Sequence, residues 1–530
     1  MMKKIKEFVD DWKYVAVLSL LMIFLALGLR LYHLGIIPVF ADEAIYVRWA
    51  QVMRAEPTLR FLPLSDGKQP LFMWLVIPFL KIISDPLFAG RATSIIAGIG
   101  TMVGVFALSY YFFKSKKVAL IASLLYAISP FAVFFDRMAL VDSLLAMFGI
   151  WTFFFAALTA GTLRLDFAML TGFALGGALL TKSPALFFSI LLPSTWIFSN
   201  WPKGKTAKAI QLLKLVSLFF VSYLIGYGLY NILRLGPNFH LVGSRNQDYI
   251  LPISHLWTNP KDPFISLIVK SFEWIKVMGP GTVLFMAVVG IFVNRRKHFK
   301  EIVVLAAWFL LPILVQSEFA RVYTARYIVF TLPFLFIIAA SSFMIESAFY
   351  SKIMIFILLI FVYQALIFNR LLLTNPQEAK LPQGERSGYL EEWTSGYGIK
   401  EVADYIKEEQ SKGPNKIVVG TEGYFGTLPD GLQMYLNADP KITVIGVGLD
   451  IREIPISLIE SRDAGNETFL VINNSRFKGD PEELGLELIS AYPKALRLKG
   501  TREFNTKGPQ ESLLFFKVVD KPSSSLKNKL

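Results

Sequence analysis

The amino-acid sequence predicts a polytopic α-helical membrane protein with about eleven spans, followed by a soluble α/β domain at its C-terminal end. Three observations predict this class. Of the 530 residues, 54% are hydrophobic and 18% are charged, and the mean hydropathy of +0.50 is too high for an ordinary soluble chain of this length. Long apolar segments alternate with short basic turns as far as Arg370. From Thr374 on, the sequence is polar and mixed in charge.

Charge and cysteine content exclude two classes of function. The formal net charge of +14 does not indicate nucleic-acid binding, because the prominent lysines and arginines lie in short turns between apolar segments. The chain contains no cysteine, which excludes disulfides and thiolate metal sites.

The expected spans follow from placing the basic turns on one side of the membrane. The first span, Tyr14 to Leu34, is long enough to cross a bilayer and is expected to be an uncleaved anchor. A large first outer loop, residues 35–90, follows it. Within this loop the apolar piece from Pro70 to Ile83 is short for a hydrocarbon core of about 30 Å, so we expect a juxtamembrane or re-entrant helix. The other spans are expected at residues 91–113, 118–135, a segment ending near 161, 167–181, 185–198, 210–233, a segment ending near 294, 302–316, 323–345 and 352–368.

The positive-inside rule then predicts the orientation. The turns at Lys114, Lys203 and Arg295 are placed in the cytoplasm, together with the N-terminus. With an odd number of spans, everything after Arg370 lies on the extracytoplasmic side. The predicted location is the plasma membrane, with domains at residues 1–373 and 374–530.

The C-terminal region is predicted to be a small α/β sandwich behind a linker that contains Pro376, Pro382 and Gly384. Apolar spacing predicts a helix over residues 399–409 and strands over 416–420, 442–446, 468–472 and 512–519. No phosphate loop, nucleophile elbow or metal-ligand cluster is apparent in this region. We therefore expect it to be extracytoplasmic and non-catalytic, and to cover or select the acceptor.

Two adjacent carboxylates, Asp42 and Glu43, follow the first span, where a water-facing site is the usual explanation for charge at membrane depth. Transfer from a lipid phosphate needs a base that takes the proton of an acceptor hydroxyl, and cations that offset charge on the departing phosphate. Asp42 is the candidate base, and Glu43 is the second catalytic candidate, because the sequence alone leaves open which of the two faces the acceptor. The candidates for the phosphate side are Lys68, Arg137, Lys182 and Arg326.

Each candidate also has a purely structural interpretation. Asp42 would serve as the N-cap of an amphipathic interfacial helix, and Glu43 would complement the positive end of that helix. Arg137 and Asp142 would form a structural pair. The three remaining cations would reach along the interface by snorkelling. The sequons at Asn466 and Asn473 are short enough to arise by chance.

Five short motifs resemble those of the GT-C superfamily of membrane glycosyltransferases, especially the protein O-mannosyltransferase and lipid A aminoarabinose transferase group. The resemblance covers roughly Met1 to Arg370. The motifs are Asp42-Glu43, Lys68-Gln-Pro-Leu71, Arg137-Met-Ala-Leu-Val-Asp142, Leu180-Thr-Lys-Ser-Pro184 and Ala325-Arg-Tyr-Ile-Val-Phe-Thr-Leu-Pro333.

The resemblance implies a hexosyl- or pentosyltransferase with a polyprenyl or dolichyl phosphate sugar as donor. The acceptor is a hydroxyl of a protein, a lipid or a cell-envelope glycan on the outer face, and the reaction is expected to invert the anomeric centre. By the same resemblance Asp42 is the catalytic base, and Lys68 contacts the lipid phosphate. The lysine and arginine motifs of later spans line the same cavity.

Two departures from the family pattern leave the cofactor open. Gly67 stands where aminoarabinose transferases carry a glutamate implicated in metal binding, and Gln69 replaces the first of the usual prolines. A divalent metal therefore stays uncertain, with Asp142, His240 or His255 as possible ligands or as second-sphere residues. A transporter or flippase is the alternative function, although we find no internal repeat of the kind transporters show. A structural or receptor protein would leave the charges unexplained.

Overall fold

The computed structural model describes residues 2–437 and 439–520. The chain divides into two compact units. Unit 1 contains the residues up to Leu34, Glu56–Leu75 and Arg91–Leu381; unit 2 contains Gly35–Ala55, Val76–Gly90 and the described residues from Pro382 on. Unit 2 thus includes two segments of the first outer loop besides the C-terminal region. The last ten residues of the expected domain 374–530, 521–530, lie outside the described residues.

Seven helices of the described chain are long and apolar enough to cross a membrane, and the number rises to nine if each of two bent helix pairs is one span. The bent pairs are α5 (Lys116–Ile128) with α6 (Pro130–Asp136), and α13 (Phe264–Met278) with α14 (Thr282–Asn294). The seven are Trp12–Leu31 of α1 (Met2–Leu31), α4 (Pro86–Phe113), α7 (Val141–Thr162), α10 (Lys205–Tyr230) continued through η5 (Asn231–Leu235), α15 (Phe299–Phe319), Ala325–Met344 (η6, α16 and η7) and α17 (Ala348–Thr374).

The structure therefore confirms a multi-pass helical protein; by length and composition, seven to nine helices of the described chain qualify as spans, against about eleven expected. Two expected spans are shorter apolar helices. The first is α8 (Leu165–Thr181), about 25 Å long at 1.5 Å per residue. The second, Ser183–Phe198, is broken into η3 (Ser183–Ala185), α9 (Leu186–Leu191) and η4 (Leu192–Phe198), with prolines at the start of both 3₁₀ pieces. The apolar piece of the first outer loop forms α3 (Leu71–Phe79), nine residues long, which is too short to span.

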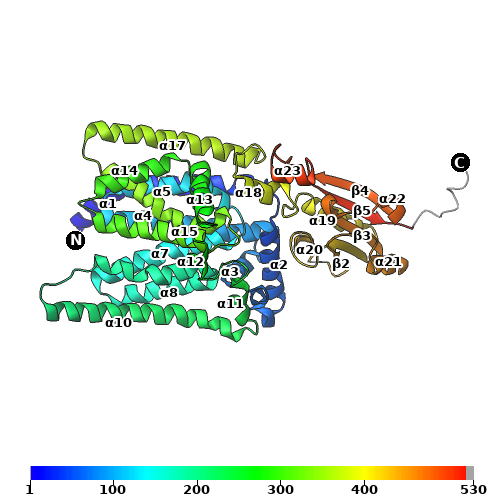
Figure 1. Ribbon diagram of the computed structural model, residues 1–530, viewed down its shortest axis with the longest axis horizontal. Helices are drawn as coiled ribbons and strands as arrows, with labels where there is room; N and C mark the ends of the chain where they lie inside the picture. Colours follow the sequence, from blue (N-terminus) through cyan, green and yellow to red (C-terminus); the bar gives the residue numbers. More distant parts are fainter. Residues whose placement is uncertain (1, 438, 521–530) are drawn as a thin grey trace, which may run out of the picture. The chain divides into compact units, whose positions relative to one another are not determined.

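Small residues bring α8 and α10 into close contact, and the two helices run side by side in Figure 1. A Cβ atom at Gly172 would lie 2.7 Å from Cβ of Ile225, and one at Gly176 would lie 2.5 Å from Leu229. Ser222 of α10 also donates a hydrogen bond to the carbonyl of Ala168, at 2.7 Å. Small residues at a helix interface allow this close approach of the two backbones.

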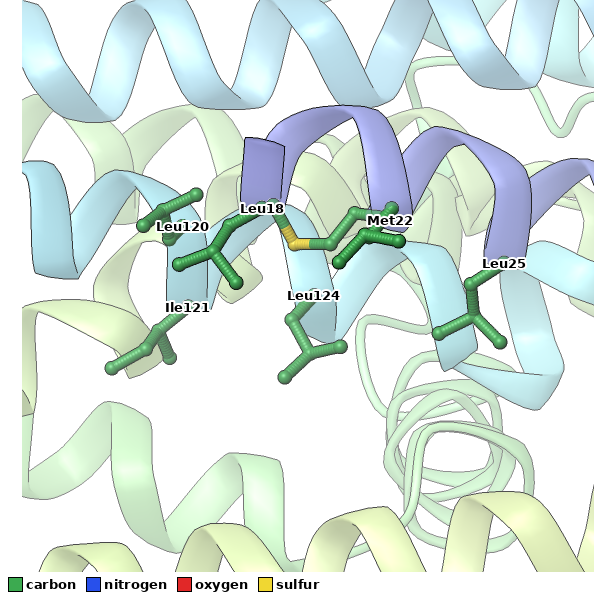
Figure 2. A pocket seen from close by; sticks show the side chains of 7 residues that line it. Leu18, Met22, Leu25, Leu120, Ile121 and Leu124 are labelled. Carbon is green, nitrogen blue, oxygen red and sulfur yellow. The ribbon is translucent and has the colours of Figure 1, made fainter. Parts of the chain in front are cut away.

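An apolar groove of about 310 Å³ lies between α1 and α5 (Figure 2). Leu18, Leu21 and Leu25 of α1 are 47%, 58% and 40% exposed, and they are accompanied by Met22. Leucines exposed along a membrane-crossing helix are expected where a helix meets acyl chains rather than water. The groove is lined by Leu18, Leu21, Met22, Leu25, Leu120, Ile121 and Leu124.

Unit 2 contains a five-stranded sheet with the order β2-β1-β3-β5-β4. Strand β1 runs parallel to β2 and β3, whereas β5 is antiparallel to β3 and β4. Four strands were predicted, and β4 was missed because this edge strand is largely exposed and lacks a clean apolar alternation. The bounds are β1 (Ile417–Glu422), β2 (Ile442–Gly448), β3 (Glu467–Asn473), β4 (Leu486–Pro493) and β5 (Ser512–Val518).

Helices cover both faces of this sheet. On one face, Tyr405 of α19 (Ile399–Lys412) packs against the rings of Phe469 and Phe515, at centroid distances of 6.3 and 5.3 Å. On the other face, Leu458 of α21 (Ile456–Asp463) belongs to a core cluster with Leu470. The residues of β3 thus alternate between the faces, as a strand requires. The other helices of the C-terminal region are α18 (Gln383–Arg386), the π-helical turn Ser387–Glu391, α20 (Thr427–Leu436), α22 (Pro481–Leu484) and α23 (Arg502–Lys507).

The helix that follows the first span, α2 (Ala41–Ala55), packs within unit 2 against α20. Gln51 donates to the carbonyl of Met434 at 2.9 Å. Ile45, Trp49 and Met53 are buried, so this helix is not the amphipathic interfacial helix of the structural interpretation.

Candidate active site

The two adjacent carboxylates occupy different environments at the start of α2. The segment before the helix is extended, and its end is held by a hydrogen bond from the amide of Ala41 to the carbonyl of Thr394, at 3.1 Å. Glu43 is fully buried, and its Oε2 accepts the amide of Phe40 at 3.0 Å. This is the back-reaching half of a capping box. Asp42 lies in the first turn and is partly exposed. Of the two, Asp42 is therefore the carboxylate better placed to reach a substrate.

A second group of predicted residues meets in unit 1. The Nζ atom of Lys182, at the end of α8, lies 2.6 Å from Oδ1 of Asp142 in the first turn of α7. It also lies 4.4 Å from the centre of the Tyr327 ring in η6 (Ala325–Thr331), and the Arg326 guanidinium lies 5.6 Å from the same ring. Lys182 interacts electrostatically with Asp142, Arg326 and Lys68. These residues form the cation cluster: Lys68, Lys182 and Arg326 with Asp142 and Tyr327.

Lys68 reaches the cation cluster from the first outer loop. Its Nζ lies 5.1 Å from the centre of the Tyr249 ring. The next residue, Gln69, donates a hydrogen bond from Nε2 to Oγ of Ser183, at 2.9 Å. Because Ser183 follows Lys182 directly, this bond fastens the loop beside the second lysine. Gln69, the second departure from the family pattern, thus links the motif that contains Lys68 to the motif that contains Lys182.

The backbone conformation at position 67 favours glycine. It ends η2 (Leu62–Asp66) in the left-handed region, with φ of +67°. A Cβ atom here would lie 2.8 Å from Cβ of Arg245 and 2.8 Å from the carbonyl oxygen of Leu241, both in α11 (His240–Asn246). A glutamate at this position would be strained and would clash, which explains the first departure from the family pattern.

The segment between η5 and α13, which contains α11, supports the same region. Leu64 and Val242 form a buried cluster with Leu180 and Leu233, which packs the loop against the end of α8. The amide of Arg321 donates to the carbonyl of Tyr249 at 2.8 Å, which holds the ring beneath Lys68 in place. The sequence-based expectations missed both tyrosines of the site. Tyr327 directly follows Arg326 in a quoted motif and was within reach, whereas Tyr249 carries no sequence signal.

Arg137 serves another purpose in the structure. Its side chain is buried, and its guanidinium donates four hydrogen bonds of 2.7 to 3.0 Å to backbone carbonyls at the C-terminal end of α1. A cation there satisfies carbonyls that the helix leaves unpaired. The neighbouring Asp136 forms a fully buried ion pair of 2.8 Å with Arg30 of α1. The interpretation of Arg137 and Asp142 as a pair is wrong, because Asp142 pairs with Lys182. The backbone carbonyls that accept the four hydrogen bonds of Arg137 belong to Leu29, Arg30, Tyr32 and His33.

The histidines do not converge with carboxylates into a metal site. His255, at the start of α12 (His255–Thr258), has its Nδ1 3.3 Å from Oε1 of Glu318, and His240 is exposed at the start of α11. Within residues 2–437 and 439–520, no group of three or more histidine, aspartate or glutamate side chains is arranged to hold a metal ion. We therefore assign no step of the reaction to a metal.

The part of the chain that contains the cation cluster also matches a known protein family. Residues 67–226 match the model of the dolichyl-phosphate-mannose-protein mannosyltransferase family. The matched stretch begins at Gly67 and includes Lys68, Asp142 and Lys182. No curated protein sequence matches significantly.

Solved structures match over nearly the whole chain. Crystal structures of ArnT from Cupriavidus metallidurans, in the apo state and bound to undecaprenyl phosphate, are 15% and 14% identical, with TM-scores of 0.55 and 0.53. Each match covers 96% of this chain and 98% of that chain. The archaeal oligosaccharyltransferase AglB from Archaeoglobus fulgidus, in complex with an inhibitory peptide and a dolichol-phosphate, is 12% identical with a TM-score of 0.52, covering 88% of this chain and 70% of that chain. The chain therefore shares the fold of these structures.

Proposed function

We propose that the protein is a glycosyltransferase that moves a sugar from a polyprenyl or dolichyl phosphate to a hydroxyl acceptor. The cation cluster carries this proposal, because Lys182 and Arg326 lie beside the ring of Tyr327, Asp142 pairs with Lys182, and Lys68 acts electrostatically on Lys182. The match to a mannosyltransferase family and the fold shared with proteins solved with undecaprenyl phosphate and dolichol-phosphate support it. The same matches do not favour a transporter or flippase.

The cation cluster fits a lipid phosphate on charge. A sugar phosphodiester carries one negative charge, and its phosphate gains a second as the sugar departs. Asp142 carries one negative charge against the positive charges of Lys68, Lys182 and Arg326, and Lys68 has no ion-pair partner among the described residues. Fixed cations that are already in place where charge develops stabilise the transition state more than the ground state. We assign the donor phosphate to Lys68, Lys182 and Arg326, and we assign Arg137 to fixing the end of α1.

Asp42 is the proposed general base. As the acceptor oxygen forms its bond to the anomeric carbon, the hydroxyl proton passes to the Asp42 carboxylate. The bond between the anomeric carbon and the phosphate oxygen breaks, and the lipid phosphate leaves with the electron pair. A single displacement of this kind inverts the anomeric centre. The partial exposure of Asp42, compared with the buried and hydrogen-bonded Glu43, supports this assignment.

We further propose that the protein lies in the plasma membrane with its N-terminus in the cytoplasm and with the reaction on the outer face. This orientation rests on the basic turns at Lys114, Lys203 and Arg295.

The decisive experiment is transfer from a labelled polyprenyl-phosphate sugar to extracted cell-envelope acceptors by the purified protein. Labelled acceptor is expected with the wild-type protein and not with Asp42→Asn. Mass spectrometry of the purified protein is expected to detect co-purified polyprenyl phosphate. Absence of both transfer and bound lipid phosphate would contradict the proposal.

A further inference from the structure

The sheet of unit 2 contains a topological switch point. The chain passes from β1 through α20 to β2, and from β2 through α21 to β3, while β1 lies between β2 and β3. The two connections lie on opposite faces. Gly431 of α20 packs against Ile399 of α19, on the face that Tyr405 covers, whereas Leu458 of α21 packs on the other face. In open α/β sheets, ligands bind outside the carboxyl ends of the strands where the connections diverge, here between β1 and β3.

Two buried polar residues occupy this point. Glu422 is the last residue of β1 and Asn473 the last of β3, and their exposed fractions are 3% and 1%. The amide nitrogen of Asn473 donates to Oε2 of Glu422 at 2.7 Å, and its Nδ2 donates to Oε1 at 2.6 Å. Burial raises the pKa of the Glu422 carboxyl, while the hydrogen bonds from Asn473 and the charge of Arg476 counteract the rise.

One acceptor of this pair is left over. The Oδ1 atom of Asn473 is buried and has no hydrogen-bond partner within the described part of the chain. A buried acceptor without a partner costs about 1–3 kcal/mol, so native proteins rarely keep one without a reason. Burial also makes Asn473 a poor glycosylation acceptor, although it begins a sequon. The donor for this acceptor lies outside the protein chain, as a buried water molecule would supply.

Aromatic side chains surround the same edge. The guanidinium of Arg476 lies 3.3 Å from Oε1 of Glu422 and 4.3 Å from the centre of the Trp393 ring. Tyr424 and Phe425, which follow Glu422 in the chain, are 77% and 49% exposed, and Trp393 is 36% exposed. Exposed apolar side chains that gather at one place mark binding surfaces, whereas single ones are ordinary.

Gly446, near the end of β2, allows the segment that carries these aromatic residues to pass close to the strand. A Cβ atom at Gly446 would lie 2.7 Å from Cα of Tyr424, so only glycine lets the segment after β1 cross this strand. The aromatic residues are therefore held by the sheet itself, which makes the edge a formed surface.

We propose that this carboxyl edge of the sheet binds a neutral carbohydrate. Exposed aromatic faces stack on the C–H faces of a pyranose ring, while the partly exposed Arg476 guanidinium, which Glu422 holds in place, offers a directional donor for its hydroxyl groups. Glu422 and Arg476 offset each other's charge, and β1 is not followed by a glycine-rich phosphate loop, so an anionic ligand is not favoured. The assignment of this carbohydrate as the acceptor glycan rests on the proposed function, whereas the binding itself does not.

The test measures binding to the full-length protein. The protein is purified in lauryldimethylamine oxide, because alkyl glycoside detergents carry a sugar themselves. Saturation-transfer difference NMR is recorded with mannotriose, maltotriose and N-acetylchitotriose. At least one probe is expected to give signals on its C–H protons. Trp393→Ala and Tyr424→Ala are each expected to weaken its binding about tenfold, and Trp393→Phe to restore most of the affinity because it keeps a ring.

A matched control distinguishes binding at this site from nonspecific binding of the carbohydrate to exposed aromatic rings. Trp257 of α12 is 68% exposed and lies in unit 1, so Trp257→Ala removes a similar ring from elsewhere and is expected to leave binding unchanged. Absence of signal for all three probes, or unchanged binding in Trp393→Ala and Tyr424→Ala, would overturn the proposal. Undecaprenyl phosphate binding is measured on the same samples. If the lipid fails to bind while the carbohydrate binds, the proposed transferase function fails and the carbohydrate site stands.

Discussion

The ammonium group of Lys182 lies 2.6 Å from Oδ1 of Asp142, although 40 residues separate them in the sequence. The pair forms where the end of α8 returns to the start of α7. It holds the lysine in place without neutralising the cluster, because Arg326 and Lys68 also act on it. Lys182→Ala should therefore weaken undecaprenyl phosphate binding about 10- to 100-fold, the loss of one charge-assisted contact. Calorimetric titration checks this, and Lys203→Ala, which removes an exposed basic residue, should bind normally. Equal affinities of Lys182→Ala and wild type would remove Lys182 from the phosphate site.

Substitutions of the two carboxylates of α2 should have different effects. Asp42→Asn keeps the shape of the side chain and removes its basicity, so turnover should fall about 10²- to 10⁴-fold while lipid phosphate binding persists. Glu43→Gln keeps an oxygen that can accept the Phe40 amide, so its main expected effect is a loss of stability of about 1 kcal/mol. Transfer assays and thermal unfolding distinguish the two. Normal transfer by Asp42→Asn together with loss of transfer in Glu43→Gln would reassign the base.

Gly67 should tolerate no side chain. Gly67→Ala combines a left-handed backbone with overlap against Arg245 and Leu241, and it should destabilise unit 1 by roughly 2–4 kcal/mol. Gly204 provides the control, since it has φ of +96° but a Cβ atom added there would meet nothing within 4 Å. Gly204→Ala should cost only about 1 kcal/mol. Thermal unfolding in detergent compares the two variants, and equal losses would show that the contact with α11 contributes nothing.

Asp430 of α20 should make stability depend on pH. Burial raises the pKa of this carboxyl from 3.8 to about 6, against the lowering effects of the Gly426 amide and of Arg48. Between these values the folded protein binds more protons than the unfolded chain, so this residue's contribution to stability falls as pH rises from about 4 to 6 and is constant above. The Asp430→Asn variant should not lose stability in this pH range, and at pH 7.5 its free energy of unfolding should exceed that of the wild type by up to roughly 2–3 kcal/mol. Melting temperatures measured from pH 4 to 8 check it. A difference between the two proteins that does not change with pH would contradict the assignment.

The membrane orientation can be tested on a clean background, because the chain contains no cysteine. Single cysteines at the exposed positions Ser65 and Ser411 should react with an impermeant maleimide in intact cells. A cysteine at the exposed Lys297, in the basic turn after α14, should react only after lysis. The reverse labelling pattern would invert the proposed topology.

Local sequence determined much of this protein. Continuous apolar runs predicted the helical membrane part, and apolar strands bounded by turns predicted β1, β2, β3 and β5, because hydrophobic burial depends on which residues follow one another. The charged motifs around Lys68, Lys182 and Arg326 were also visible in the sequence, since charge near an apolar segment needs an explanation.

Tertiary structure decided how the polar groups are used. Arg137 and Lys182 look alike as basic residues beside apolar segments, yet one satisfies the carbonyls of α1 and the other pairs with Asp142. Glu43 and Asp42 are adjacent, yet only Glu43 is buried against the Phe40 amide. The free Oδ1 of Asn473 exists only because β1 and β3 lie side by side. Hydrogen-bond partners are set by contacts between distant segments, and a linear pattern does not contain those contacts.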